Sequence, residues 1–241
     1  MKRLLVLSSL LLVISCQAQW GKTVKGNGDM TTETREVNDY ESIHVAGSLN
    51  VVLTEGTEGT ISVRADENLQ EYIIVETKGN SLSIKVEDGY NLKSSSGNKL
   101  LITVPVEAIE AVNLAGSGDV VGKFLIRADS FSTAAAGSGD IKLELEAQKI
   151  KSSVAGSGNL TLSGSCRDFK VSVAGSGNID ARSLVVSGEI KGSVAGSGDI
   201  ELNCDNCTLK ASISGSGDIT YSGNAAGTST SVVGSGSLTK R

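Results

Sequence analysis

Val154-Ala155-Gly156-Ser157-Gly158-Asn159-Leu160 is the stretch that decides the fold, because close copies of it recur along the second half of the chain. Its Gly-Ser-Gly core recurs at intervals of 21, 19, 19, 21, 19 and 19 residues. The copies begin at Gly116, Gly137, Gly156, Gly175, Gly196, Gly215 and Gly234. A period near twenty residues, held over consecutive copies, is typical of a repeat protein.

The residues between two cores alternate between apolar and polar. Phe169, Val171 and Val173 alternate with Lys170 and Ser172, and a period of two predicts a strand with one buried face. The equivalent inward positions nearby are Ile150, Val154, Ile179, Ala181, Ile190, Val194, Ile200, Leu202, Leu209, Ala211 and Ile213. No repeat contains an apolar run long enough for a crossover helix. The pattern therefore predicts an all-β fold, a single-stranded parallel β-helix with coils of 19–21 residues that stack about 4.8 Å apart.

The Gly-Ser-Gly core itself has two interpretations. If the strand continues through it, Gly156 and Gly158 face inward, while Ala155, Ser157 and Asn159 form part of a flat outer strip. Alternatively, the core is a tight corner, which its composition also suits.

The residue after each core is Asp or Asn in every copy but the last, which has Ser237. These residues are Asp119, Asp140, Asn159, Asn178, Asp199 and Asp218. Stacked carboxylates about 5 Å apart repel by roughly 1 kcal/mol or less in water, and the central asparagines relieve that repulsion. Because the position holds either Asp or Asn, we expect a shared hydrogen bond to turn amides. The same ladder is the candidate binding site.

The N-terminal half contains two degenerate copies of the motif. Gly26 and Gly47 begin them and are 21 residues apart, which predicts that the solenoid register begins before residue 30. The period then breaks, because Gly47 and Gly116 are 69 residues apart.

Candidate strands in this interval cover 61–65, 72–76, 82–86 and 100–104, and turn residues separate them. A helical turn over 66–72 would have Asp66 as its N-cap. We interpret the interval as irregular coils or hairpins that cap the edge of the first regular coil, which would otherwise invite strand addition. The expected organisation is a leader over 1–18, an N-terminal β region over 19–113 and regular repeats over 114–241, the last two forming one domain.

The first residues read as an export signal. Lys2 and Arg3 precede an apolar run over 4–14, which predicts a secretory leader. Val13 to Cys16 resembles a lipobox, which would leave Cys16 as a lipidated N-terminus, but Cys16 to Ala18 can also be an ordinary cleavage site. Both readings predict export to the periplasm, the outer membrane or the cell surface. A lipid on Cys16 would anchor the protein without spanning the membrane.

Three cysteines follow the leader. Cys204 and Cys207 lie at a predicted turn, where either a local disulfide or two free thiols is consistent with an exported chain. Cys166 lies two coils earlier, roughly 9–10 Å away if the coils stack regularly, which exceeds the limit of about 7 Å for a disulfide. We therefore expect Cys166 to be unpaired. No zinc site is predicted, because further ligands are missing and the only histidine, His44, is far away in the sequence.

Composition excludes several classes of protein. The 241 residues carry a net charge of −5 and only 3% aromatic residues, which suits thin coils and provides no basic patch for nucleic acid. No segment after residue 18 is apolar for long enough to span a membrane, and no motif calls for a cofactor.

The repeat array, the stretch from Tyr40 to Gly47 and the segment from Asp66 to Ile73 together resemble one family. It is described as "putative auto-transporter adhesin, head GIN domain" and consists of exported proteins found largely in Bacteroidetes-type bacteria. The resemblance covers about residues 37–237. It implies a right-handed parallel β-helix and an adhesin-like role, and it supplies no catalytic residues.

The leading hypothesis is a non-catalytic binding or adhesion module of the cell envelope, whose partner is an envelope glycan or a surface protein. A rigid rod with repeated flat faces suits weak, multivalent contacts. A purely structural envelope lipoprotein is the alternative that assigns no ligand to the ladders.

Two further hypotheses use the Asp/Asn ladder. Asp119 with Asp140, or Asp199 with Asp218, would have the spacing of about 5 Å that suits a retaining glycosidase acting on polysaccharide. Stacking alone produces that spacing, however, and minimal coils build no enclosing cleft. A calcium ladder resembles the β-roll pattern only faintly, since the period here is near twenty and not nine.

Overall fold

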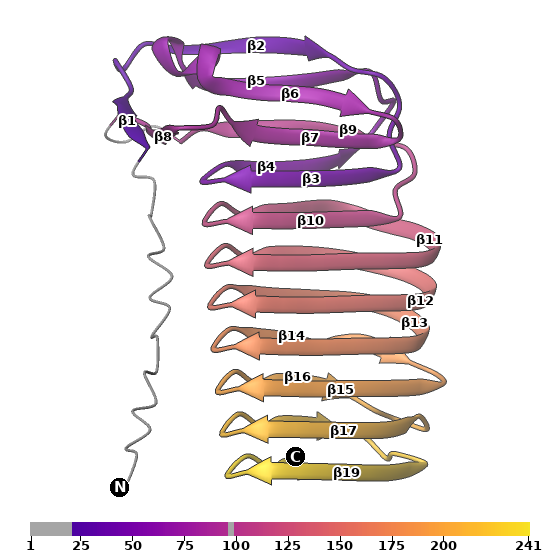
Figure 1. The fold of residues 1–241 in the computed structure, drawn as a ribbon. Helices are drawn as coiled ribbons and strands as arrows, with labels where there is room; N and C mark the ends of the chain where they lie inside the picture. Colours follow the sequence, from indigo (N-terminus) through magenta and orange to yellow (C-terminus); the bar gives the residue numbers. More distant parts are fainter. Residues whose placement is uncertain (1–20, 96–98) are drawn as a thin grey trace, which may run out of the picture.

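The computed structural model describes residues 21–95 and 99–241. The predicted leader over 1–18, with Cys16, lies outside the described residues. The fold is a β-solenoid of about 7 turns, with 70% of residues in strands and 3% in helix. The predicted parallel β-helix is therefore confirmed (Figure 1).

Each regular coil runs along one side of the solenoid, bends and returns along the other. Three long strands wrap around the bend in the middle coils, whereas the later coils divide into two strands each. The long strands are β11 (Val120–Gly137), β12 (Ile141–Gly156) and β13 (Asn159–Gly175). The divided coils are β14 (Asn178–Val186) with β15 (Glu189–Gly196), β16 (Ile200–Asn203) with β17 (Thr208–Gly215), and β18 (Ile219–Ser222) with β19 (Gly227–Gly234), followed by β20 (Leu238–Lys240).

The solenoid has two outer faces. One set of strands ends at the first glycine of each core, and we call its outer side the front face. This set consists of β10 (Ala111–Gly116), the second halves of β11, β12 and β13, and the strands β15, β17 and β19. The back face is the outer side of β14, β16, β18, β20 and the first halves of the long strands. All these strands pair in parallel.

The sequence repeat and the spatial repeat coincide. Gly137 pairs with Gly156, and Gly156 pairs with Gly175 in the next coil. The predicted inward residues Phe169, Val171 and Val173 are each 1% exposed. The inward phase is therefore confirmed, and it fixes which side chains reach the surface.

The first coil lies on the other side of the long interval. It consists of β3 (Ser42–Gly47) and β4 (Asn50–Glu55). Gly47 pairs directly with Gly116 although 69 residues separate them in the sequence. The intervening chain is thus an insertion that leaves the stack and returns to it.

That insertion builds the cap at the top of Figure 1. It contains β5 (Thr60–Asp66), a 3-10 helix over Glu67–Tyr72, β6 (Ile73–Lys78), β7 (Ser81–Val86), β8 (Tyr90–Lys93) and β9 (Leu101–Val106). Strand β7 pairs in parallel with β3, and β9 pairs in parallel with β4. Strand β6 then pairs antiparallel with β7, and β5 pairs antiparallel with β9. The edge of the first coil is covered, as predicted, and antiparallel pairing ends the solenoid.

The prediction that the solenoid begins before residue 30 is wrong. The strand β1 (Lys22–Lys25) pairs with β8, and β2 (Met30–Glu36) pairs antiparallel with β5, so neither continues the parallel stack. The glycines between β1 and β2 instead lie against the carboxylate of the buried Asp66. The backbone N–H of Gly28 donates to Asp66 Oδ1 at 2.8 Å, and a side chain at Gly26 would collide with that carboxylate.

The predicted helical turn is confirmed as the 3-10 helix over Glu67–Tyr72, with Asp66 at its N-cap position. The side chain of Asp66, however, makes no capping hydrogen bond there. Its Oδ2 accepts the backbone N–H of Ser95 at 3.2 Å, and the residue is fully buried. Asp66 therefore joins three separate segments of the cap.

Candidate functional site

The Gly-Ser-Gly core is a corner. Strand β12 ends at Gly156 and β13 begins at Asn159. The carbonyl oxygen of Gly137 accepts the backbone N–H groups of Ser157 at 2.8 Å and Gly158 at 2.9 Å. Every regular corner is thus bonded to the corner of the preceding coil.

Both glycines of the corner are required by geometry. Gly156 has a φ of +125°, a conformation that disfavours side chains. A Cβ atom at Gly156 would collide with the oxygen of Gly137, and one at Gly158 with the oxygen of Gly139. Gly158 is buried while Ser157 and Asn159 are exposed, so the alternation of the strand persists through the turn.

The Asp/Asn residues form a continuous ladder of hydrogen bonds beside these corners. Asp140 Oδ1 accepts the backbone N–H of Asn159 at 2.9 Å, and Asn178 Oδ1 accepts that of Asp199 at 2.9 Å. The other contacts join Asp119 to the N–H of Asp140 at 3.3 Å, Asn159 to the side-chain amide of Asn178 at 3.3 Å, Asp199 to the N–H of Asp218 at 2.8 Å, and Asp218 to the N–H of Ser237 at 2.7 Å. Each bond uses Oδ1, which Asp and Asn share, so the ladder tolerates either residue.

This geometry gives the ladder a structural task. An Asp Oδ1 bonded to the next coil replaces a backbone acceptor that the corner lacks. Among residues 21–95 and 99–241, no group of three or more His, Cys, Asp or Glu side chains is placed to hold a metal ion. The ladder also lies outside the groove described below, and of its members only Asp119 lines a separate hollow, of about 500 Å³.

The front face carries straight columns of small side chains. Ser153, Ser172, Ser193 and Ser212 pair in register in one column. Ala136, Ala155, Ala174 and Ala195 pair in register in the next. In the part of the chain that the structure describes, no further element packs over this face (Figure 1).

A lysine column borders these small residues. Lys151 pairs with Lys170, Lys170 with Lys191, and Lys191 with Lys210. All four are exposed. Sequence reasoning missed this column, although its signal is simple, because each lysine stands five residues before the first glycine of a core.

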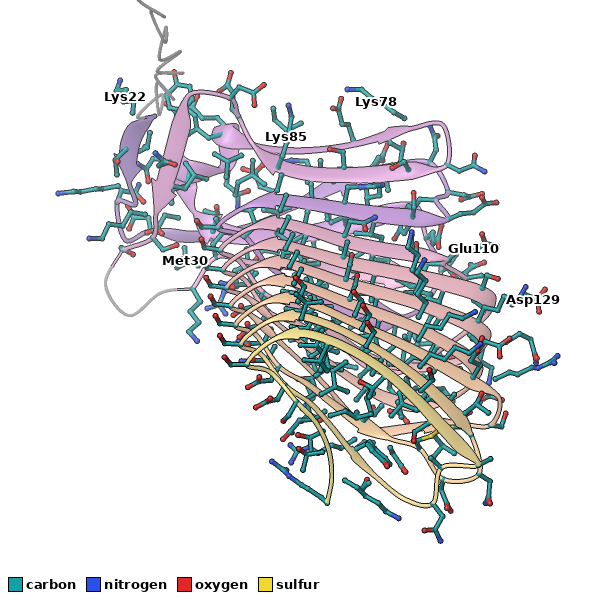
Figure 2. The ribbon with its side chains drawn as sticks, turned by 60° about the horizontal axis from the view of Figure 1, so that its bottom comes forward. Lys22, Met30, Lys78, Lys85, Glu110 and Asp129 are labelled. Carbon is teal, nitrogen blue, oxygen red and sulfur yellow. A yellow bond between two sulfur atoms is a disulfide. The ribbon has the colours of Figure 1, made fainter. Side chains whose placement is uncertain are left out.

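An open groove of about 780 Å³ runs beside the lysine column. Its floor includes Phe131, Ile150 and Phe169, whose side chains point into the core and leave a hollow between the outward residues on either side. Lys151, Lys170 and Lys191 belong to one wall. The opposite wall carries Glu110, Ser130, Lys149, Asp168 and Glu189. In Figure 2, Glu110 and Asp129 project from the edge where the coils bend.

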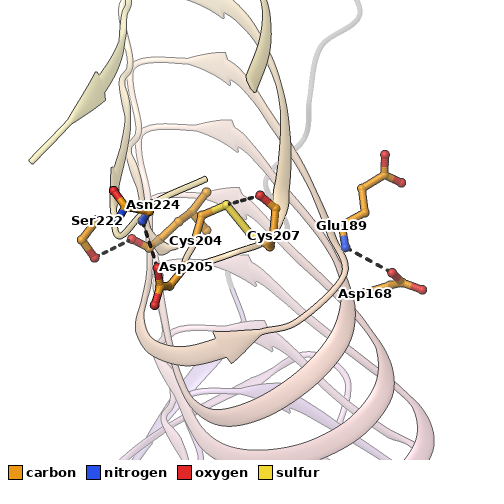
Figure 3. The surroundings of a disulfide bond; sticks show 8 residues. Asp168, Glu189, Cys204, Asp205, Cys207, Ser222 and Asn224 are labelled. Atoms are coloured by element: carbon orange, nitrogen blue, oxygen red, sulfur yellow. Dashed lines mark hydrogen bonds between the residues drawn. A yellow bond between two sulfur atoms is a disulfide. The ribbon is translucent and has the colours of Figure 1, made fainter. Parts of the chain in front are cut away.

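Ion pairs to one glutamate partly compensate the charge at one end of this lysine column. Glu189 bonds to Lys191 at 2.6 Å and to Lys210 at 2.5 Å. Hydrogen bonds from these two lysines lower the pKa of Glu189. No ion pair is formed by Lys149, Lys151 or Lys170 within the described residues. Figure 3 shows Glu189 beside Asp168, whose Oδ1 accepts the backbone N–H of Glu189 at 3.3 Å.

The cysteines lie at the opposite bend of the chain from the corners. A disulfide joins Cys204 to Cys207, with their Cα atoms 5.4 Å apart (Figure 3). Cys166 is free and buried. Burial, with a contribution from the charge of Asp168, raises the pKa of the Cys166 thiol to about 12. Cys166 is therefore protonated and unsuited to nucleophilic chemistry.

Comparison with known proteins identifies the family. The family model described as "Putative auto-transporter adhesin, head GIN domain" matches residues 39–225. The chain belongs to this family, as its resemblance implied. No curated protein matches the chain.

Solved structures share the fold over nearly the whole chain. A protein of Parabacteroides distasonis, described as a "putative lipid binding protein", is 26% identical with a TM-score of 0.74, over 91% of this chain and 100% of its own. A "putative adhesin" of Bacteroides fragilis is 23% identical with a TM-score of 0.80, over 90% and 100%. Another from Parabacteroides merdae is 22% identical with a TM-score of 0.71, over 92% and 100%. The likeness to the last two shows the fold alone.

Within residues 21–95 and 99–241, no helix has the length and apolar character needed to cross a bilayer.

Proposed function

We propose that this protein is a non-catalytic binding module of the cell envelope that contacts its partner through the front face. The observation that carries the proposal is the set of columns on that face. Ser172 and Ala174 repeat in register from coil to coil, and the side chains of these two columns are small. Such a face offers the same contact several times along a rigid axis, so individually weak contacts add through avidity.

The partner is an envelope glycan or a surface protein. Family membership supports an adhesin-like role, and the relatives with solved structures are described as adhesins or as a lipid-binding protein. Export to the periplasm or the cell surface, with Cys16 as a lipid anchor, is part of the proposal. It rests on the leader sequence over residues 1–18.

A polysaccharide-cleaving role receives less support from the geometry. The paired carboxylates Asp119 with Asp140 and Asp199 with Asp218 are engaged with backbone N–H groups of the following coils. They stand on exposed corners, whereas a glycosidase surrounds its substrate with a cleft.

The test compares one substitution on each face. Ala174→Glu places a larger, charged side chain on the front face, and Thr161→Glu places the same side chain on the back face, in the first half of the same strand β13. The wild type and both variants are applied to an array of bacterial surface polysaccharides and to immobilised surface proteins. We expect the wild type and Thr161→Glu to bind the same spots and Ala174→Glu to lose them. Absence of binding by the wild type would favour the purely structural alternative.

A further inference from the structure

The strongest unexplained feature is the lysine column at the edge of the front face. Lys151 and Lys170 stack directly on adjacent coils, where like charges repel and destabilise the pair. The fold does not need lysine there, because the same column holds Ala111, Ser132 and Ser229 in other coils. An arrangement that costs stability and is not required by the strand position points to a ligand.

The unpaired lysines gather in the middle of the groove. Lys149 and Lys151 flank the buried Ile150 from opposite walls, and Lys170 follows Lys151 one coil further. At the far end, Glu189 forms ion pairs with both Lys191 and Lys210 and so cancels one of their two positive charges. The groove therefore has a cluster of three lysines that form no ion pair within the described residues, with Asp168 on the coil next to Lys149, above an apolar floor.

The acidic groups limit which anion can lie there. Glu41 and Glu110 also line the groove. On the wall, Asp168 pairs in register with Lys149, and Glu189 forms ion pairs with Lys191 and Lys210. A chain with a negative charge on every unit would meet these carboxylates. A chain whose charges are spaced apart can place one in the lysine cluster and pass neutral units over the acidic groups.

We infer that the groove binds a linear acidic polysaccharide along the solenoid axis, with an anionic group held by Lys149, Lys151 and Lys170. This inference rests on the proposed function and names the class of its ligand. Stacked coils repeat every 4.8 Å or so, so an extended chain lying along the groove meets an equivalent set of side chains in each coil. Binding to an anionic membrane is disfavoured, because the exposed large apolar residues among those described are Val185, Val232 and Val233, outside the groove.

The experiment measures binding of hyaluronan, whose carboxylates fall on alternate sugars, with neutral dextran and phosphatidylserine vesicles as comparison probes. We expect hyaluronan alone to bind, with an affinity that falls as salt screens the lysines. Lys151→Gln with Lys170→Gln should weaken binding about thirtyfold, the loss typical of two surface lysines facing an anion. The matched control is Lys123→Gln with Lys142→Gln, two exposed back-face lysines with the same change in net charge.

A second variant should change the affinity for hyaluronan in the opposite direction. Glu189→Gln releases Lys191 and Lys210 from their ion pairs and should strengthen hyaluronan binding. The inference is overturned if hyaluronan does not bind, if vesicles bind in its place, if both lysine doubles weaken binding equally, or if Glu189→Gln weakens it. If hyaluronan does not bind, but another ligand on the array binds the wild type and is lost in Ala174→Glu, the proposed function stands and only this inference fails. If the wild type binds no ligand at all, both the proposed function and this inference fail.

Discussion

The carboxylate of Asp199 accepts the backbone N–H of Asp218, one coil further along, at 2.8 Å. Both residues carry a negative charge, yet the bond requires only an oxygen at the Oδ1 position. The same role falls to Asn178 toward Asp199. The ladder is therefore a means of holding successive corners together.

The first prediction separates this structural role from a metal or catalytic one. Asp199→Asn keeps the Oδ1 acceptor and should leave the melting temperature unchanged, whereas Asp199→Leu should lose about 1–2 kcal/mol of stability, as expected for a lost hydrogen bond. Thermal melts of both variants, with and without calcium, provide the measurement. A calcium-dependent rise in the wild type that is absent in Asp199→Asn would instead establish a metal ladder.

The second prediction concerns the close approach of the corners. Gly158→Ala would drive its Cβ into the oxygen of Gly139, so we expect a loss of about 1–3 kcal/mol or more from overpacking. Gly227→Ala is the matched control, because a Cβ at Gly227 meets nothing within 4 Å. Chemical denaturation compares the two. Equal stability of both variants would show that the corners are less tightly stacked.

The third prediction uses the buried Asp66. Burial alone would raise the pKa of Asp66, but hydrogen bonds from the Ser95 side chain and from the backbone N–H groups of Gly28 and Ser95 outweigh it and lower that pKa. A depressed folded-state pKa stabilises the protein above the unfolded value of about 3.9, and this contribution is lost as the pH falls through the folded pKa.

Asp66→Asn isolates that contribution. The wild type should lose more stability than Asp66→Asn when melts at pH 5 are compared with melts below the unfolded-state pKa. An equal loss in both proteins would mean that Asp66 does not support the cap through its charge.

The fourth prediction concerns the thiols. Cys166 is buried with a pKa of about 12, so an alkylating reagent at neutral pH should leave it unmodified in the folded protein. Denaturation without reductant should expose Cys166 alone, and Cys204 and Cys207 should react only after reduction. Peptide mass mapping distinguishes these states. A bridge from Cys166 to either partner would contradict the coil register.

The solenoid could be predicted from the sequence because the repeat is nearly exact and strand periodicity is local. Alternation alone predicts the inward direction of Phe169, Val171 and Val173, and all three are buried. The corner could not be separated from a continuous strand, because burial keeps the same alternation through Gly156 and Gly158 while only the backbone turns.

The cap was harder to predict because its partners are distant in the sequence. Gly26 and Gly28 resemble a repeat copy, yet they surround Asp66, roughly forty residues away, through contacts that no local pattern reports. The lysine groove is a different case. Its residues are visible at a constant offset from each core, but the hollow beside them appears only when Ile150 and Phe169 turn inward in three dimensions.

Binding through the front face is tested most directly by placing a reporter on each face. Ser172→Cys and Thr161→Cys accept an environment-sensitive fluorophore while the buried Cys166 stays unlabelled. Each labelled protein is titrated with the array polysaccharide or surface protein that binds the wild type most strongly. We predict a saturable emission change for the label at residue 172 and none for the label at residue 161. A change confined to residue 161 would contradict the proposal that the front face meets the partner.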